Sequence, residues 1–349
     1  MRLKNVLASW FLLAVTFFAY IHALHYQSYL LQVHEVFGLE FTGRGYLVGC
    51  VLSYALGLAV FYLVEKDPSV SKSVLCCRAV RRIVLAPGTV WRAGLPYEER
   101  LGLLATLLKA FFAPLMVIWL VDHTDNMLAN GTALLHAGSR VWTDFVPVFD
   151  AYGFWFLLQV VIFADVFFFT IGYLIEHPRL GNEIRSVDPT WLGWAAALVC
   201  YPPFNQLSSW ILGWAASDFP RFESATAHVT LNLLLLGLMA VYSSASIALN
   251  LKASNLTHRG IVSCGPYAYV RHPAYVCKNM AWWIAAIPTA AAAFDQSLWK
   301  GVLAVASVVG WSMVYVLRAL TEEDHLRSID GEYDRYAARV RYRFIPGLY

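Results

Sequence analysis

Long runs of apolar residues constrain the fold of this chain more than any other feature. Eight runs of about 20 residues carry almost no charge, and this is the length that an α-helix needs to cross roughly 30 Å of hydrocarbon. They lie at 6–24, 45–64, 101–121, 153–175, 191–214, 227–249, 274–294 and 298–320. With 59% hydrophobic and 14% charged residues and a mean hydropathy of +0.54, the composition does not suit a soluble globule. We therefore predict an all-α, polytopic membrane helix bundle of about eight spans.

The fifth run is interrupted. Pro202 and Pro203 remove two backbone donors, which predicts a kinked or split span. Asn205 and Gln206 follow within apolar sequence, where amide groups need partners from the protein or from a ligand. Tyr201, Asn205 and Gln206 are therefore candidates for binding a hydrophobic acceptor, and a simple kink is an equal alternative.

The distribution of positive charge predicts the orientation. The loop between the second and third runs contains Lys66, Lys72, Arg78, Arg81, Arg82 and Arg92. The loop after the third run has Arg140 as its only Lys or Arg. Because Lys and Arg are enriched in cytosolic loops, we expect both termini and residues 251–273 in the cytosol. The first run lacks a cleavage site and is interpreted as a retained span, in a bacterial inner membrane or, if the source is eukaryotic, the endoplasmic reticulum.

Composition indicates neither nucleic-acid binding nor a metal centre. The net charge of +3 is concentrated on the predicted cytosolic loops, where it reflects topology and contact with anionic lipid head groups. The six cysteines lack the CxxC spacing of a zinc site. His22, His25 and His34 with Glu35 suggest a metal hypothesis, but their spacing matches no recognised ligand pattern, so we expect no metal.

A polar, proline-bounded segment near the C-terminus is the main candidate site. The segment, here named the cassette, reads Cys264-Gly265-Pro266-Tyr267-Ala268-Tyr269-Val270-Arg271-His272-Pro273-Ala274-Tyr275. Lipid cannot satisfy such a segment, so it must face water or a ligand. Pro273 predicts a helix start whose free amides, together with Arg271, would hold a carboxylate or phosphate. Tyr267, Tyr269 and Tyr275 offer faces for a flat ring and a sugar.

Three adjacent acids follow the last apolar run. Glu322, Glu323 and Asp324 are expected to attract a cation. The short connection at 295–297 predicts two antiparallel helices that bring 265–275 and 321–326 together. A ligand with an anionic group, cationic groups and a flat heterocycle would fit both segments, and S-adenosylmethionine has this inventory.

The C-terminal motifs resemble a known family of membrane enzymes. The resemblance rests on the cassette, on Glu322-Glu323-Asp324-His325-Leu326, and on Gly331-Glu332-Tyr333 with Tyr336, Arg339-Val340 and Phe344-Ile345-Pro346. Over about 250–349, these motifs are similar to the isoprenylcysteine carboxyl methyltransferase and phospholipid methyltransferase superfamily. The resemblance implies an integral-membrane transferase that takes S-adenosylmethionine from the cytosol and a lipid-like or prenylated acceptor from the bilayer.

The same resemblance implies site residues and a division of the chain. The donor pocket would be lined by Tyr267, Arg271, His272, Pro273, Tyr275, Glu322 and Glu323 and closed by Tyr336 and Arg339. We assign Arg271, His272 and Glu322 to catalysis; a carboxylate or thiolate acceptor needs no base, whereas an amine or hydroxyl would need His272 or a glutamate. Residues 1–226 would form an N-terminal membrane region of five spans with the acceptor cavity. Residues 227–349 would form a methyltransferase-like module of three spans and a cytosolic tail.

Two alternatives remain. The tail at 341–349 is also similar to the end of membrane sterol reductases, which bind NADPH. Adjacent carboxylates at Glu322 and Glu323 favour the methyltransferase, because they suit a cationic donor and repel the phosphates of a nicotinamide dinucleotide. A carrier or structural membrane protein that has kept the fold is the alternative without catalysis.

Overall fold

The computed structural model describes residues 1–65, 69–329 and 331–348, and most of them are helical. Lys66 of the first basic loop and Tyr349 of the tail lie outside the described residues. The N-terminal elements are α1 (Arg2–His22), η1 (Leu24–Tyr26), α2 (Gln27–Leu31), β1 (Val33–Val36), β2 (Leu39–Thr42), α3 (Gly43–Val64), α4 (Lys72–Leu85), α5 (Pro87–Ala93), α6 (Tyr97–Ala137), α7 (Arg140–Thr143), α8 (Phe145–Val148), η2 (Phe149–Gly153) and α9 (Phe154–Leu174). They are followed by η3 (Pro178–Leu180), β3 (Ser186–Val187), α10 (Trp191–Leu198), α11 (Phe204–Leu212), α12 (Ala225–Leu249), η4 (Asn250–Lys252), β4 (Thr257–His258), η5 (Gly265–Ala268), α13 (Pro273–Gln296), α14 (Leu298–Arg327) and α15 (Glu332–Arg339).

Six helical segments in the described part of the chain are long and apolar enough to cross a membrane. They are Arg2–His22, Gly43–Val64, Tyr97–Ala137, Phe145–Leu174, Ala225–Lys252 and Leu298–Arg327. The protein is therefore an integral membrane protein built as a polytopic helical bundle, as predicted.

Eight spans were predicted and six helical segments among the described residues meet the criteria for a span, so two predicted spans remain to be explained. The run at 191–214 forms two short helices, α10 and α11, separated at Pro202-Pro203, which confirms the predicted interruption. The run at 274–294 forms the continuous 24-residue helix α13. Lys278, Asn279 and Pro288 make α13 less apolar than the six segments, so it does not reach the composition of a typical span.

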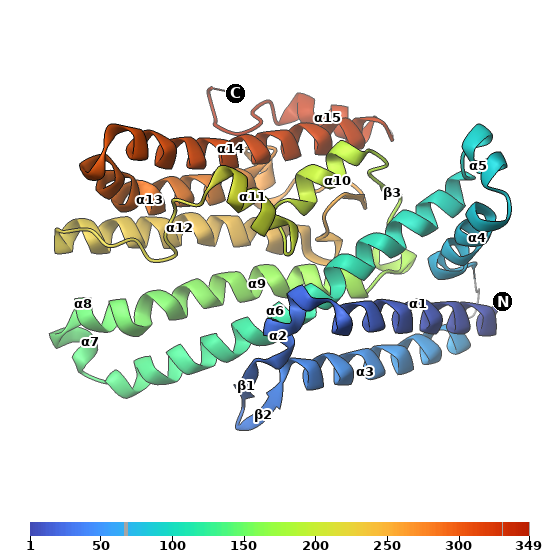
Figure 1. Cartoon of the computed structure of the whole chain (residues 1–349), viewed down its shortest axis with the longest axis horizontal. Helices are drawn as coiled ribbons and strands as arrows, with labels where there is room; N and C mark the ends of the chain where they lie inside the picture. Colours follow the sequence, from blue (N-terminus) through green and yellow to red (C-terminus); the bar gives the residue numbers. More distant parts are fainter. Residues whose placement is uncertain (66–68, 330, 349) are drawn as a thin grey trace.

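The long helices lie roughly side by side (Figure 1). Helix α9 contacts α6 and α12, and α13 contacts both α12 and α14. Helices α1 and α3 pair with each other at the other edge of the bundle, and α4 packs on α6. The short helices α10 and α11 contact α14. The broken segment therefore lies against the helix that carries the adjacent acids. Two small antiparallel pairs, β1 with β2 and β3 with β4, complete the fold.

Local sequence explains where the helices near the cassette begin. Thr190 caps α10, since its Oγ1 accepts a hydrogen bond from the Gly193 amide at 3.1 Å. Pro273 occupies the first turn of α13, where its missing amide costs nothing. Ser297 caps α14 directly after α13 ends, so the two helices are joined by a single residue. This connection makes them antiparallel neighbours and returns the chain to the cassette, as predicted.

Close packing and ion pairs hold the end of α9. A Cβ at Gly172 would lie 1.9 Å from the carbonyl oxygen of Ala253, so this helix position has no room for a side chain. Two residues beyond α9, the half-buried Glu176 pairs with Lys72 and, at 2.6 Å, with Lys109. Burial opposes ionisation of Glu176, but the two ammonium groups outweigh it and lower the pKa of this carboxyl to about 2. These contacts link α4, α6 and α9.

Candidate functional site

A cavity lies between the cassette, the end of α14 and the broken α10–α11 segment. Its empty volume is about 960 Å³, including the part open to solvent. Lining residues from the first part of the chain are Phe169, Asp188, Gly193, Ala197 and Tyr201. From the second part they are Tyr242, Ser246, Leu249, Ser254, Asn255, Leu256, Thr257, Tyr267, His272, Ala274, Tyr275, Lys278, Tyr315, Arg318, Thr321, Glu322 and His325. Both predicted regions of the chain therefore contribute to one cavity.

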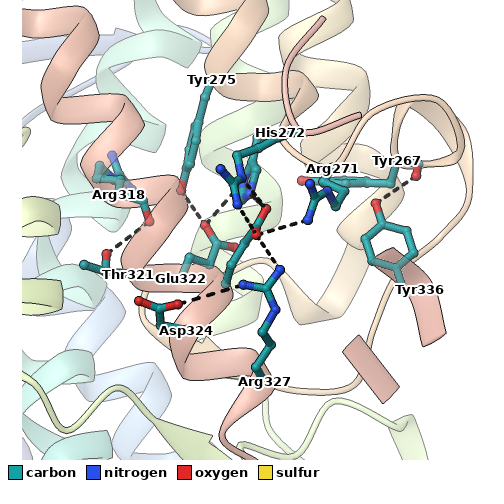
Figure 2. A network of polar contacts seen from close by, with 12 residues as sticks. Tyr267, Arg271, His272, Tyr275, Arg318, Thr321, Glu322, Asp324, Arg327 and Tyr336 are labelled. Carbon is teal, nitrogen blue, oxygen red and sulfur yellow. Dashed lines mark hydrogen bonds and ion pairs between the residues drawn. The ribbon is translucent and has the colours of Figure 1, made fainter. Parts of the chain in front are cut away.

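Four residues predicted from the C-terminal motifs meet at this cavity. Tyr267, His272, Tyr275 and Glu322 all line it. The Tyr275 hydroxyl donates to Glu322 Oε2 at 2.7 Å, and Figure 2 shows the tyrosine directed at this carboxylate. The His272 ring stacks on Tyr275 with 5.3 Å between ring centroids. The expected proximity of the cassette and the acids is present.

Glu323 does not line the cavity, unlike its neighbour. Its side chain is 0% exposed and accepts hydrogen bonds from four residues. The partners are Arg271 Nη1 at 3.1 Å, His272 Nε2 at 3.1 Å, Arg327 Nη2 at 2.9 Å, and Arg343 Nε and Nη2 at 3.0 and 2.9 Å. Adjacent positions on a helix face different directions, so the pair cannot act as one double acid. The expectation that Glu323 lines the donor pocket is corrected: it is the centre of a buried ion cluster.

Arg271 belongs to this cluster as well. Its guanidinium binds Glu323, its amide donates to the Tyr342 carbonyl at 3.0 Å, and the His272 amide donates to the Arg343 carbonyl at 3.1 Å. Arg271 lies outside the set of residues that line the cavity. The expected anion site on Arg271 is therefore occupied by Glu323, and the arginine instead fastens the C-terminal tail to the cassette.

The remaining C-terminal candidates lie around the cavity without lining it. Tyr336 is buried, and its hydroxyl donates to the Tyr267 carbonyl at 2.8 Å, so it supports the tyrosine that does line the cavity (Figure 2). Pro273 is buried at the start of α13. Tyr269 and Arg339 are exposed to solvent. Burial, followed by the Glu322 charge, raises the pKa of Tyr267, so its hydroxyl stays protonated at neutral pH.

Of the three residues predicted to bind the acceptor, one lines the cavity and two do not. Tyr201 lines the cavity, and its hydroxyl accepts from Asn255 Nδ2 at 3.2 Å. Asn205 and Gln206 lie outside the lining residues, and Gln206 is exposed. After the break at Pro202-Pro203, Asn205 and Gln206 lie in the first turn of the new helix α11, where the Asn205 amide donates to the Tyr201 carbonyl at 3.0 Å.

Sequence reasoning missed two cations in the cavity. Arg318 is only 7% exposed; its guanidinium carbon lies 5.1 Å from the Tyr275 ring centroid and 5.2 Å from that of Tyr315, and its Nη2 donates to Asn255 Oδ1 at 2.9 Å. The Lys278 ammonium lies 5.3 Å from the Tyr242 ring centroid. Each of these cations lies within an apolar run of the sequence. A charge there is energetically unfavourable in a membrane and usually marks a functional site, so this feature could have indicated both residues.

The geometry defines a polytopic membrane protein with an aromatic cavity that contains both an acid and cations. Residues 208–340, from α11 through α15, match a family described as a protein of unknown function (DUF1295). No curated protein and no solved structure matches the chain. The description of the family names no reaction, so the match does not choose between the two enzyme classes considered above.

Proposed function

We propose that the protein is an S-adenosylmethionine-dependent methyltransferase acting on a hydrophobic or lipid-linked acceptor at the cytosolic membrane face, with both termini in the cytosol. The observation that carries the proposal is the Tyr275–Glu322 pair on the cavity wall, 2.7 Å apart and beside the Tyr267 and Tyr315 side chains. A sulfonium is a cation, and both a carboxylate and aromatic faces favour a cation.

The residues present also suit the rest of the donor. The Nε of Arg318 is buried and has no hydrogen-bond partner among the described residues. A charged donor without a partner is costly in a dry site, and a carboxylate from a ligand would satisfy it. We therefore propose that Arg318 holds the carboxylate of S-adenosylmethionine, while Glu322, Tyr275 and Tyr267 hold its sulfonium and adenosine.

Methyl transfer depends more on the alignment of donor and acceptor than on reactive side chains of the protein. The reaction is an in-line displacement in which sulfur loses its positive charge, and S-adenosylmethionine supplies the methyl group. The protein must orient the acceptor and exclude water, and it needs no covalent nucleophile. His272 is poorly placed as a free base, because its Nε2 already contacts Glu323 Oε1 at 3.1 Å. We retain it as a group that orients Tyr275 by stacking.

The acceptor would enter from the bilayer at the broken segment. Leu207, Trp210 and Ile211 on α11 are strongly exposed, as expected for side chains that face lipid. Tyr201, at the start of the break, reaches the cavity. We propose that Tyr201 contacts the acceptor, and Asn205 and Gln206 remain predictions for its path.

An NADPH-dependent reductase of a sterol or other isoprenoid is the second candidate, and one observation favours it. Glu323 is paired with three arginines and does not line the cavity. Of the two glutamates, Glu322 alone therefore places negative charge at the cavity. Arg318 and Lys278 also line the cavity and would attract phosphates. The electrostatic objection to a dinucleotide is therefore weaker than the sequence alone indicates.

Calorimetric titration of the purified protein separates these functions. We expect S-adenosylhomocysteine to bind and NADPH to show no saturable heat. Arg318→Gln should weaken S-adenosylhomocysteine binding by about ten- to a hundredfold, the loss of one charge-assisted contact. Binding of NADPH alone would establish the reductase reading, and binding of neither ligand would favour a carrier or structural protein.

A further inference from the structure

An aspartate lies inside one of the membrane spans, and the reaction described above does not use it. Asp165 is in α9 and is 9% exposed. Its Oδ2 accepts a hydrogen bond from the Tyr242 hydroxyl at 2.7 Å, and its Oδ1 accepts one from the Ser246 hydroxyl. A carboxylate within a span is costly, and such residues usually serve a proton or substrate pathway.

The two hydroxyls connect this aspartate to the cavity. Tyr242 and Ser246 lie one turn apart on α12, and both line the cavity, whereas Asp165 lies behind them. The Lys278 ammonium lies 5.3 Å from the Tyr242 ring centroid. Tyr242 is thus a hydroxyl on the cavity wall, with a proton acceptor on one side and a cation beside it.

We propose that Asp165 is the general base of the methyl transfer and that Tyr242, on the cavity wall, relays the acceptor proton to it. This inference rests on the proposed methyltransferase function and deepens it. It assigns the acceptor to the class with a transferable proton on the attacking atom: a hydroxyl, phenol, amine or thiol. Carboxylate and phosphate acceptors have no such proton and would leave the pair without a task.

The step balances in atoms and charge. The acceptor atom forms a bond to the methyl carbon, and the carbon–sulfur bond breaks with its electron pair moving to sulfur. The acceptor proton passes to Tyr242 Oη while the Tyr242 proton passes to Asp165 Oδ2. The positive charge on sulfur and the negative charge on Asp165 disappear together, so no net charge is created where charge is poorly solvated.

Proton counting tests this assignment without knowledge of the natural acceptor. The full-length protein, with S-adenosylmethionine and a total lipid extract of its source membranes, is assayed in weak buffer with a pH indicator. We expect one proton released for each S-adenosylhomocysteine formed. Tyr242→Phe and Asp165→Asn should each lower S-adenosylhomocysteine formation at least about a hundredfold, the usual contribution of a general base. Their affinity for S-adenosylhomocysteine should stay within about threefold of wild type, a separation that general misfolding would not give.

Tyr242→Phe is the decisive variant, because it keeps the ring beside Lys278 and removes only the hydroxyl. Tyr54→Phe is its matched control: the Tyr54 hydroxyl, on α3, donates to the Leu174 carbonyl at 2.8 Å and lies away from the cavity. This control should keep wild-type turnover. Zero protons per product, or a Tyr242→Phe variant within about threefold of wild-type turnover, would overturn the base assignment alone. Failure of the wild type to bind S-adenosylhomocysteine would instead overturn the proposed function.

Discussion

Glu323→Gln should destabilise the protein strongly, because Glu323, on α14, is a buried carboxylate that binds both the cassette and the C-terminal tail. It is fully buried and accepts hydrogen bonds from Arg271, His272, Arg327 and Arg343 over distances of 2.9–3.1 Å. Glutamine removes the negative charge and points an amide donor at groups that are themselves donors. Breaking a buried ion pair in this way costs about 3–5 kcal/mol, since charges are left without compensation.

The neighbouring acid supplies the contrast. Glu322 is 45% exposed at its side chain and bonds to Tyr275, so Glu322→Gln should cost less than about 1 kcal/mol of stability. Thermal inactivation half-lives of the purified variants measure this difference even if unfolding is irreversible. The double variant Glu323→Gln with Arg343→Gln should recover part of the loss, because one uncompensated charge is removed. Equal half-lives for Glu323→Gln and wild type would refute the cluster as a stabilising centre.

Three further predictions concern pH, packing and topology. The pKa of the Glu176 carboxyl is lowered to about 2, against about 4.3 in the unfolded chain. Its ionised form therefore adds about 3 kcal/mol to the free energy of unfolding above about pH 4.3, and this stabilisation is lost as the pH falls toward 2. Acid unfolding of the wild type should be steeper in this pH window than that of Glu176→Gln. Gly172→Ala should cost about 1–3 kcal/mol by forcing α9 away from a backbone carbonyl, whereas Gly237→Ala, with open space around it, should be neutral or stabilising in thermal melts. Cysteine labelling should place 72–96 and the C-terminal tail on one membrane face and the α7–α8 connection on the other, and labelling of the first two on opposite faces would contradict the proposed orientation.

Much of the fold could be predicted because membrane spans depend on length and composition. The apolar runs, the break at Pro202-Pro203, and the helix start at Pro273 follow from local chemistry alone. The approach of the cassette to Glu322 followed from the short connection between two helices. These features require no knowledge of side-chain packing.

Which side chains line the cavity depends on the direction in which each one leaves its helix, and the order of residues in the sequence does not reveal this direction. Glu322 and Glu323 are adjacent in sequence, yet one lines the cavity and the other is buried among arginines. Three charged residues of the site lie in runs whose mean hydropathy is high: Asp165, Lys278 and Arg318. The mean hydropathy of a run does not reveal a single charged residue within it. A search for single charges within apolar runs would have found all three.

The affinity of three proteins for S-adenosylhomocysteine tests the central claim most directly: wild type, Glu322→Gln and Asp324→Asn. Each variant neutralises one acid on the same helix turn, but Glu322 lines the cavity, whereas Asp324 is exposed and does not. We expect Glu322→Gln to weaken binding by about ten- to a hundredfold, equivalent to about 1.5–3 kcal/mol, and Asp324→Asn to bind as wild type. Equal affinity in all three proteins, or a loss confined to Asp324→Asn, would contradict the assignment of this cavity to a methyl donor.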